Sequence, residues 1–294
     1  MTERTTKKIS RRDFLKLAGT GGAITFLAGL GGAKYISKME MGELDLVELS
    51  LELPRLTPAF DGYKIAIIGD IHIGGWMTHE RLIPAIDLVL EQSPDIIFHT
   101  GDFLAGHSWT PEVEAHLNDL IIELKRLSKN ILNIAVMGNH DHWTNVSAVR
   151  EGLQEADIIE LENTFYTLRR GTDELYICGV DDIWEKKDDL NALLMQLPAE
   201  NPAILLAHEP DFADTSVSTK RFDLQISGHS HGGQVVIPNI GPIVLPYLAW
   251  KYPAGLYKVG EMWQYTNRGL GTGKIPVRYN CPPEVTMLTI KTEG

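Results

Sequence analysis

The feature that most constrains this chain is a repeated ending: short apolar, β-branched runs that stop at Gly or Ala and are followed by Asp, Asn or His. The runs at residues 65–68, 96–98, 131–137, 203–207 and 224–226 end in Gly69-Asp70-Ile71-His72, Thr100-Gly101-Asp102, Gly138-Asn139-His140-Asp141, Ala207-His208 and Ser227-Gly228-His229-Ser230-His231. Such runs are typical of buried strands. Helical patterns at 81–92 and 111–127 separate the first three runs, which favours a largely parallel sheet covered by helices.

The polar residues after these strands are expected to meet in space. The carboxyl ends of parallel strands open on one crevice, where ligands bind. A glycine precedes the polar residue at four of the five run ends, and glycine lets the backbone turn sharply and approach a bound ion closely. The sequence therefore gathers seven candidate ligands: Asp70, His72, Asp102, Asn139, His208, His229 and His231.

These ligands are oxygen and imidazole donors, without a thiolate, so they suit Mn, Fe or Zn. Seven donors are too many for one ion with an open position and about right for two divalent ions that share a carboxylate. Asp102 follows the most central strand and is the expected bridge, because an anionic group must separate two cations about 3.5–4 Å apart. A hydroxide between the ions would then be the attacking group, since coordination lowers the pKa of water to about 7.

The ordered series of motifs, which spans residues 70–231, resembles the calcineurin-like metallophosphoesterase superfamily, whose members hydrolyse phosphate esters with two metal ions. The resemblance implies an α/β fold, a four-layer α-β-β-α sandwich with its dinuclear site at the strand C-terminal ends. It assigns one ion to Asp70, His72, Asp102 and His231, and the other to Asp102, Asn139, His208 and His229. His140 would face the scissile phosphate, stabilising charge or protonating the leaving oxygen.

Several residues around this set have open or peripheral roles. Asp141 either orients His140 in catalysis or caps the following helix. Arg268 either reaches the substrate phosphate or braces its loop; its segment, 257–284, resembles the C-terminal part of a bacterial branch that includes twin-arginine-exported phosphodiesterases. His142 and Trp143 are expected on the pocket wall. The histidines outside the motifs, His79, His99, His107 and His116, are interpreted as surface or packing residues.

Two further pairs carry no predicted function. The acidic pair Asp181-Asp182 follows an apolar run at 175–178 and could contact substrate, but an acidic pair at a strand end is more typical of a solvated turn. Cys178 and Cys281 could form a disulfide in an oxidising compartment, but thiols so far apart in sequence are more often separate buried residues.

The first 35 residues form a segment of a different kind. Ser10-Arg11-Arg12-Asp13-Phe14-Leu15-Lys16 precedes an uncharged, glycine-rich apolar stretch at 17–33, an order typical of a twin-arginine signal. No Ala-x-Ala follows the stretch, and roughly 17 residues could also remain as an anchor. We therefore expect a signal peptide or N-terminal anchor at 1–35 and a single metallophosphoesterase domain at 36–294. The twin-arginine translocase would deliver it to the periplasm, the cell wall or the outer face of the cytoplasmic membrane.

Charge and motif composition exclude several classes of function. The formal net charge is −12, and residues 1–34 hold seven basic but only two acidic side chains, so the remainder is more acidic still and would repel nucleic acid. The Asp-Arg-Gly clamp of protein phosphatases in the superfamily is missing, because Phe103 follows Asp102. A non-catalytic scaffold is disfavoured because no ligand is lost, and a redox protein because no haem or iron–sulfur cysteine spacing occurs.

The expected substrate is a phosphodiester, with a pyrophosphate as the alternative. Hydrolases of UDP-2,3-diacylglucosamine form a neighbouring branch, whose common proteobacterial form has Arg where this chain has His140, while a second form keeps the His. The apolar, aromatic stretch at 243–253 and the N-terminal stretch favour a lipid- or cell-wall-linked substrate and membrane contact. The stretch at 243–253 is, however, also typical of a packed loop.

Overall fold

The computed structural model describes residues 41–293. The signal peptide or anchor expected at residues 1–35 lies outside them. Between residues 41 and 293, no helix combines the length and the hydrophobicity needed to cross a bilayer.

Six strands form the first sheet, in the order β1-β14-β2-β3-β4-β5. Their bounds are β1 (Asp45–Leu53), β14 (Glu284–Thr292), β2 (Tyr63–Ile68), β3 (Ile96–His99), β4 (Leu132–Ala135) and β5 (Ile159–Glu160). Strands β2 to β5 are parallel to one another, whereas β14 lies antiparallel to β2 and parallel to β1. The parallel strands β2, β3 and β4 are those that end in the predicted Asp70, Asp102 and Asn139 motifs.

Six further strands form the second sheet, in the order β12-β13-β9-β8-β7-β6. Their bounds are β12 (Gly255–Val259), β13 (Met262–Thr266), β9 (Leu224–Ser227), β8 (Ala203–Leu206), β7 (Asp173–Gly179) and β6 (Thr164–Arg170). The four central strands are parallel and the two outer strands are antiparallel to their neighbours. A separate short hairpin joins β10 (Val236–Ile237) to β11 (Gly241–Pro242).

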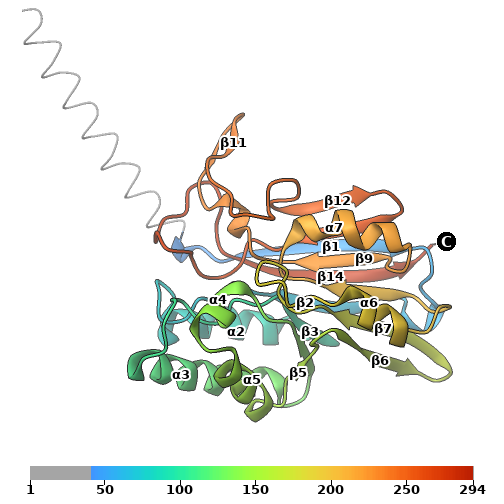
Figure 1. Cartoon of the computed structure of the whole chain (residues 1–294), viewed down its shortest axis with the longest axis horizontal. Coiled ribbons are helices and arrows are strands. Elements are labelled where there is room, and N and C mark those ends of the chain that lie inside the picture. The colour runs from blue at the N-terminus through green and yellow to red at the C-terminus, as the bar shows by residue number, and fades with distance from the viewer. Residues whose placement is uncertain (1–40, 294) are drawn as a thin grey trace, which may run out of the picture.

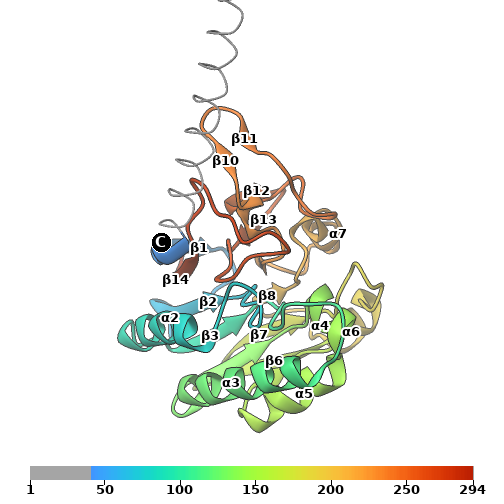
Figure 2. The ribbon, with the colours of Figure 1, turned by 90° about the vertical axis from the view of Figure 1, so that its left-hand side faces the viewer.

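Helices cover the outer face of each sheet. On the first sheet lie α2 (His79–Glu91), α3 (Pro111–Ser128) and α5 (Val146–Glu155), and on the second lie α6 (Leu190–Gln196) and α7 (Ala213–Ser216) (Figures 1 and 2). The short helix α4 (Asn139–Thr144) carries a predicted motif, and single 3-10 turns occur at η1 (Pro58–Phe60), η2 (Pro210–Phe212), η3 (Val217–Thr219) and η4 (His231–Gly233).

Three apolar layers hold these elements together. One packs the first sheet against its helices and another packs the second sheet against α6 and α7. Between the sheets, Ile65 and Phe98 of the first belong to the same buried cluster as Ile177 and Leu206 of the second. The layers are therefore α-β-β-α, which confirms the fold that the resemblance implied.

The prediction of one largely parallel sheet, made from the apolar runs alone, is wrong, because the strands form two sheets. The runs at 65–68, 96–98 and 131–137 lie in the first sheet, and those at 175–178, 203–207 and 224–226 in the second. Central strands of both sheets are buried on both faces, so the runs look alike in sequence. Cys178 and Cys281 are buried and unpaired.

Candidate metal centre

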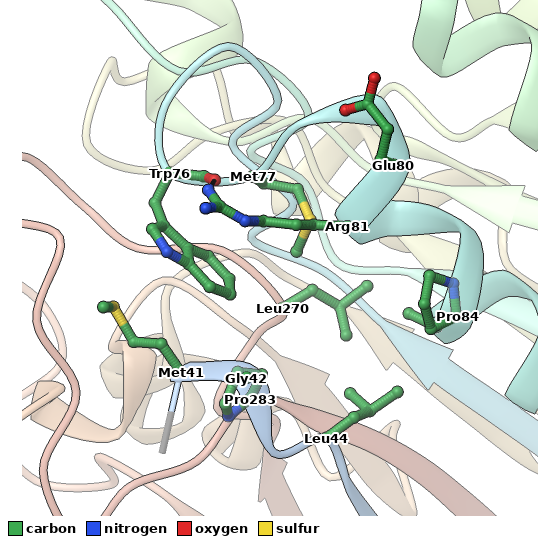
Figure 3. Close-up of a pocket in the computed structure, with 11 residues that line it drawn as sticks. Met41, Gly42, Leu44, Trp76, Met77, Glu80, Arg81, Pro84, Leu270 and Pro283 are labelled. Carbon is green, nitrogen blue, oxygen red and sulfur yellow. Dashed lines mark hydrogen bonds between the residues drawn. The ribbon is translucent and has the colours of Figure 1, made fainter. Parts of the chain in front are cut away.

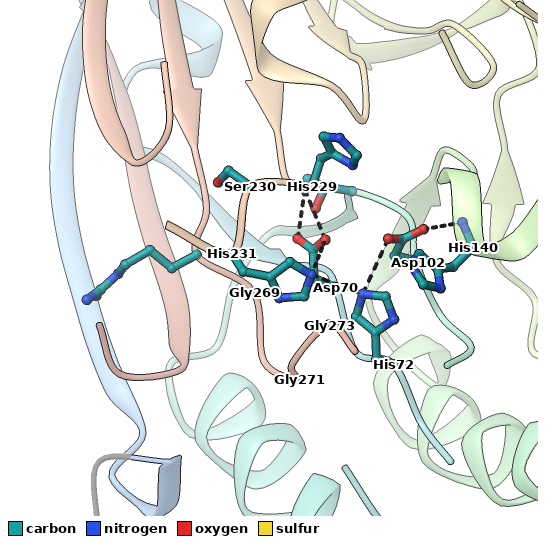
Figure 4. A network of polar contacts seen from close by, with 12 residues as sticks. Asp70, His72, Asp102, His140, His229, Ser230, His231, Gly269, Gly271 and Gly273 are labelled. Carbon is teal, nitrogen blue, oxygen red and sulfur yellow. Dashed lines mark hydrogen bonds and ion pairs between the residues drawn. The ribbon is translucent and has the colours of Figure 1, made fainter. Parts of the chain in front are cut away.

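The predicted ligands converge where the two sheets meet. Two groups of side chains could each hold an ion: Asp70, His72, Asp102 and His231 form the first, and Asp102, His208 and His229 form the second, with ligand atoms within 4.8 Å of one another in each. Asp102 belongs to both groups. Its Oδ2 atom lies 3.3 Å from Nε2 of His72 and 3.3 Å from Nε2 of His208, so this carboxylate stands between a histidine of each group. Figure 4 shows its contact with His72.

The backbone at these positions is left-handed. Five of the seven predicted ligands have positive φ angles: Asp70 (45°), His72 (47°), Asp102 (56°), His229 (68°) and His231 (51°). Non-glycine residues rarely adopt this region, although Asp and His tolerate it better than most. Such strain is typical of functional sites, where the surrounding structure holds residues in place.

Glycines make room for the carboxylates. A Cβ atom on Gly138 would lie 2.3 Å from Oδ1 of Asp102, and one on Gly228 would lie 2.5 Å from Oδ2 of Asp70. Real Cβ contacts are never this short, so any side chain at either position would displace a carboxylate. The two glycines are thus required by close approach, as the run endings predicted.

Backbone carbonyls orient two of the imidazoles. Nδ1 of His208 donates to the carbonyl of Thr100 at 2.6 Å, and Nε2 of His229 donates to the carbonyl of Tyr247 at 2.8 Å. A carbonyl can only accept, so each bond fixes the tautomer and leaves the other ring nitrogen facing the cluster. These two nitrogens, Nε2 of His208 and Nδ1 of His229, lie 3.2 Å apart. Sequence reasoning could not find these partners, because main-chain carbonyls have no residue signature.

Unpartnered atoms show that the site suits a metal. Oδ1 of Asn139, the predicted ligand atom, is buried and has no hydrogen-bond partner among the described residues. Nε2 of His72 faces Nε2 of His231 at 3.1 Å, an arrangement of two ring nitrogens that a shared ion would satisfy. Buried polar atoms ordinarily find partners, so this donor set fits divalent cations.

Buried charges dominate the electrostatics. Burial alone would raise the pKa of Asp102, but the His208, His140 and His72 imidazoles hold this pKa well below its usual range. Burial would likewise lower the pKa of His208, but Asp102 raises it well above its ordinary value. Metal ligands must be deprotonated, so an ion that binds here would displace a proton from His208.

His140 lies beside the cluster without belonging to either donor group. Its main-chain amide donates to Oδ1 of Asp102 at 2.8 Å, and its ring nitrogen Nδ1 donates to the carbonyl of Gly106 at 3.2 Å. The ring is perpendicular to that of His72, with centroids 4.6 Å apart. Burial lowers the pKa of His140 to about 4, so the ring is neutral at pH 7, with Nε2 as the unprotonated nitrogen.

Residues 63–233 match the family model described as Calcineurin-like phosphoesterase. The chain belongs to this family. It is 34% identical, over 97% of its length and 99% of the relative, to the uncharacterized metallophosphoesterase YkuE of Bacillus subtilis. It is 30% identical, over 96% of its length and 99% of the relative, to the phosphodiesterase YaeI of Escherichia coli. The protein is therefore a metal-dependent phosphoester hydrolase.

In this phosphoesterase Asp141 holds the Asp102 loop. Its buried carboxylate accepts hydrogen bonds from the main-chain amides of Asp102 (2.9 Å), Phe103 (2.9 Å), Leu104 (3.3 Å) and Gly138 (3.0 Å). The bond from Gly138 caps α4. The helix capped is α4, in which Asp141 itself lies, and not the helix after it, which Asn145 caps. None of the four bonds reaches the His140 ring, so we class Asp141 as a positioning residue.

The ion pairs of Arg268 hold its loop in place. Its guanidinium binds the carboxylates of Glu284, at the start of β14, and of Asp45, at the start of β1. Both bonds tie its loop to neighbouring strands, which is the second of the two roles that the sequence left open.

A second arginine in the same segment was missed by the sequence analysis. Arg278 is fully buried and donates to the main-chain carbonyls of Gly271, Gly269 and Arg268. The loop that it supports packs against the Asp70 turn, where a Cβ on Gly269 would lie 2.5 Å from Cβ of Asp70. Arg278 therefore shapes the backbone behind a predicted ligand.

Trp143 and His142, both expected on the pocket wall, lie in different surroundings. The Trp143 ring lies 4.8 Å from that of His140, as expected for a wall. His142 instead bonds Asp181 at 2.7 Å. The expectation of a solvated turn at Asp181-Asp182 is wrong, since both carboxylates are buried, and burial together with Glu209 raises the pKa of Asp182 to about 9.

The histidines outside the motifs pack elsewhere or at the rim. His99 is buried and bonds Oδ1 of Asn133 at 2.7 Å, and His79 pairs with Glu123. His107 stacks on Trp143 with centroids 5.0 Å apart. The interpretation of these residues as packing groups agrees with their contacts.

An apolar hollow lies apart from the donor groups (Figure 3). Its lining residues include Met41, Leu44, Trp76, Met77, Leu270 and Pro283. The Arg81 guanidinium covers the Trp76 ring, with 4.7 Å from Cζ to the centroid. The hollow has none of the predicted ligands in its lining.

Proposed function

We propose that this protein is an exported phosphodiesterase that works with two divalent ions. The observation that carries the proposal is the carboxylate of Asp102, shared by two groups of donors. The first ion would be held by Asp70, His72, Asp102 and His231, and the second by Asp102, Asn139, His208 and His229. Sharing is what two neighbouring cations require, because an anionic group between them offsets their repulsion.

Bound ions would supply an activated water and polarise the phosphate. The protein's own part begins with the strained ligand turns and the glycines beside them, which fix the carboxylates before substrate arrives. Asp141 keeps Asp102 in place through main-chain amides. The chain thus presents a rigid donor set, and little reorganisation is needed during the reaction.

His140 would handle the proton of the leaving group. The Gly106 carbonyl holds Nδ1–H, so Nε2 is the position open to substrate. An anionic phosphate next to the ring favours its protonated form, and Nε2–H can then donate to a phosphate oxygen. General acid catalysis of this kind contributes roughly 10²–10⁴-fold in rate.

Substrate, metal and location are finer parts of the proposal. The substrate class is a phosphodiester, lipid- or cell-wall-linked, with a nucleotide-sugar pyrophosphate as the competitor; the name of the relative YaeI supports the diester. Oxygen and imidazole donors suit Mn, Fe or Zn. Export through the twin-arginine translocase rests on the sequence of residues 10–16, and it would place the enzyme outside the cytoplasmic membrane.

One assay tests the central claim. The purified protein is stripped of metal, reconstituted separately with Mn, Fe and Zn, and offered chromogenic monoesters, chromogenic diesters and a nucleotide-sugar pyrophosphate. We expect metal-dependent hydrolysis that is fastest on diesters, and loss of that activity in Asp102→Ala. Activity that survives in Asp102→Ala, or that needs no metal, would contradict the proposal, and a preference for pyrophosphate would replace the substrate class.

A further inference from the structure

Exposed large apolar side chains gather on one protruding segment. We call residues 237–250, which include β11 and the loop after it, the apolar arm. Five of its side chains are between 50% and 80% exposed: Ile240, Ile243, Val244, Tyr247 and Trp250. Figure 1 shows β11, and Figure 2 shows β10 and β11, extending beyond the body of the molecule. Ile275, 66% exposed, lies on the neighbouring loop, which Gln234 joins through a hydrogen bond to the Ile275 carbonyl.

The arm is held at its base, where Ala249 is buried and the Tyr247 ring packs against Trp184. Main-chain bonds link Val236 to Tyr279 (2.9 Å) and Ile243 to Val235 (3.1 Å). The carboxylate of Asp211 accepts from the amides of Trp250 and Lys251, each at 2.9 Å. Backbone polar groups are therefore satisfied near the body while the apolar side chains face outward. An exposed apolar patch of this kind marks an interaction surface.

The charge around the arm indicates what that surface meets. The chain carries 39 acidic residues, yet residues 232–260 contain none, and neither do residues 262–283. Lys274 is exposed in the second of these segments. Bilayers that contain anionic lipids carry a negative surface potential and attract basic segments, while Trp and Tyr favour the interface between lipid and water. Carboxylates meet the arm at its base, where Asp211 and Asp214 bind the main chain of Trp250 and the side chain of Lys251. The outer part of the arm is apolar and aromatic and its own segment has no acidic residue, so it complements a lipid surface.

The base of the arm touches the candidate metal centre. The carbonyl of Tyr247 accepts the Nε2–H of His229 at 2.8 Å. The Tyr247 ring lies 5.6 Å from that of Trp184, which in turn lies 5.5 Å from the His229 ring. A surface that binds the arm would therefore lie close to the donor groups.

We propose that the apolar arm inserts into the interfacial layer of a phospholipid bilayer and holds the candidate metal centre at headgroup level. The inference deepens the proposed function, because it places phosphodiesters of the membrane within reach. The docking surface itself does not depend on metal or on hydrolysis.

The first test reports the surroundings of the arm in the full chain. Val244→Cys is labelled with an environment-sensitive fluorophore, and Met195→Cys, at a position 89% exposed on α6, is the matched control. The native Cys178 and Cys281 are buried. With vesicles of phosphatidylcholine and phosphatidylglycerol, we expect a blue shift and quenching by lipid-attached quenchers at position 244 and neither at 195. An unchanged spectrum at 244 overturns the proposal, even if the chain binds the vesicles through another segment.

The second test separates docking from catalysis. Ile243→Ser/Val244→Ser should weaken vesicle binding by at least about tenfold, since it removes two apolar side chains that the bilayer would bury. The control, Ile122→Ser/Met195→Ser, removes as many exposed apolar side chains from α3 and α6 and should bind as the unaltered chain does. Hydrolysis of a soluble chromogenic diester should be unchanged in both.

The outcomes distinguish this inference from the proposed function. Equal vesicle binding by the arm variant and its control overturns the membrane surface while leaving hydrolysis intact. Conversely, we expect Asp102→Ala to lose hydrolysis and to bind vesicles as the unaltered chain does. A blue shift at position 244 that grows with protein concentration in the absence of vesicles would identify a second copy of the chain as the occupant and would also overturn the proposal.

Discussion

The carboxylate of Asp141 accepts a 2.9 Å hydrogen bond from the main-chain amide of Asp102. An Asn at position 141 has the same shape as Asp but replaces one acceptor oxygen with an NH2 group. That NH2 group is itself a donor, so it cannot accept from the main-chain amides that the Asp141 carboxylate binds. We expect Asp141→Asn to reduce metal affinity by roughly 10–100-fold, as changes to groups that orient a ligand do. Excess metal should restore much of the hydrolysis.

Metal titration followed by a rate measurement tests this effect. Asp189→Asn is the matched control, because Asp189 is exposed, caps α6 through the Ala192 amide and belongs to neither donor group. If Asp141→Asn loses activity that no metal concentration restores, the residue acts in the reaction and not through Asp102.

The two donor groups predict a pattern of metal loss. His231 belongs to the first group only and His229 to the second only. If the proposed function holds, His231→Ala and His229→Ala should each retain about one ion per chain, and Asp102→Ala should retain fewer than either, because Asp102 would serve both ions. Elemental analysis after dialysis measures the content, with His79→Ala as control, since His79 pairs with Glu123 instead. Loss of both ions from either single variant would contradict the division.

His140 is expected to affect rate and not metal content. His140→Gln keeps a polar side chain but cannot deliver a proton, so kcat on a diester with an alkoxide leaving group should fall by roughly 10²–10⁴-fold. Metal content should match that of the unaltered protein, because His140 lies in neither donor group. The loss should shrink for a diester with a leaving group that needs no proton. A drop in bound metal would instead make His140 a ligand.

His99 predicts a dependence of stability on pH. Burial lowers its pKa to about 4 in the folded protein, while an unfolded His titrates near 6.5. The unfolded chain therefore binds more protons between these values, so stability is full above pH 6.5 and is lost as pH falls toward 4. This one group should cost about 2 kcal/mol between pH 7 and pH 5.

Urea unfolding at both pH values checks the contribution of His99. His99→Gln can retain a hydrogen bond to Asn133 but does not titrate, so its stability should fall less over the same interval. Comparison of the two proteins cancels the effects of all other groups. An identical fall in both would show that His99 is not the source.

The ligands could be predicted from sequence because each stands two to four residues after the end of a buried strand. Gly101-Asp102 and Gly228-His229 carry the glycine that close packing requires, so both position and neighbour are visible in the residue order. The runs at 65–68 and 224–226 look alike in sequence although they lie in different sheets, so the runs alone could not predict the two-sheet fold. The order of the motifs, through the family resemblance, did predict it.

Other features depend on contacts across long stretches of chain, which local patterns do not encode. Strand β14 enters the first sheet between β1 and β2, pairing Glu284 with Asp45. The carbonyls of Thr100 and Tyr247 orient two histidines without any sequence signature. The open roles of Asp141 and Arg268 could be judged only once their hydrogen-bond partners were known.

Each donor group draws side chains from both halves of the sandwich. Asp70 and Asp102 follow strands of the first sheet, whereas His208 and His231 follow strands of the second. Ions bound there would cross-link the two sheets, so the sheets could not shift or separate without losing the ions. Substrate must then enter from the open rim of loops, and removal of the ions should loosen the whole sandwich as well as stop the reaction.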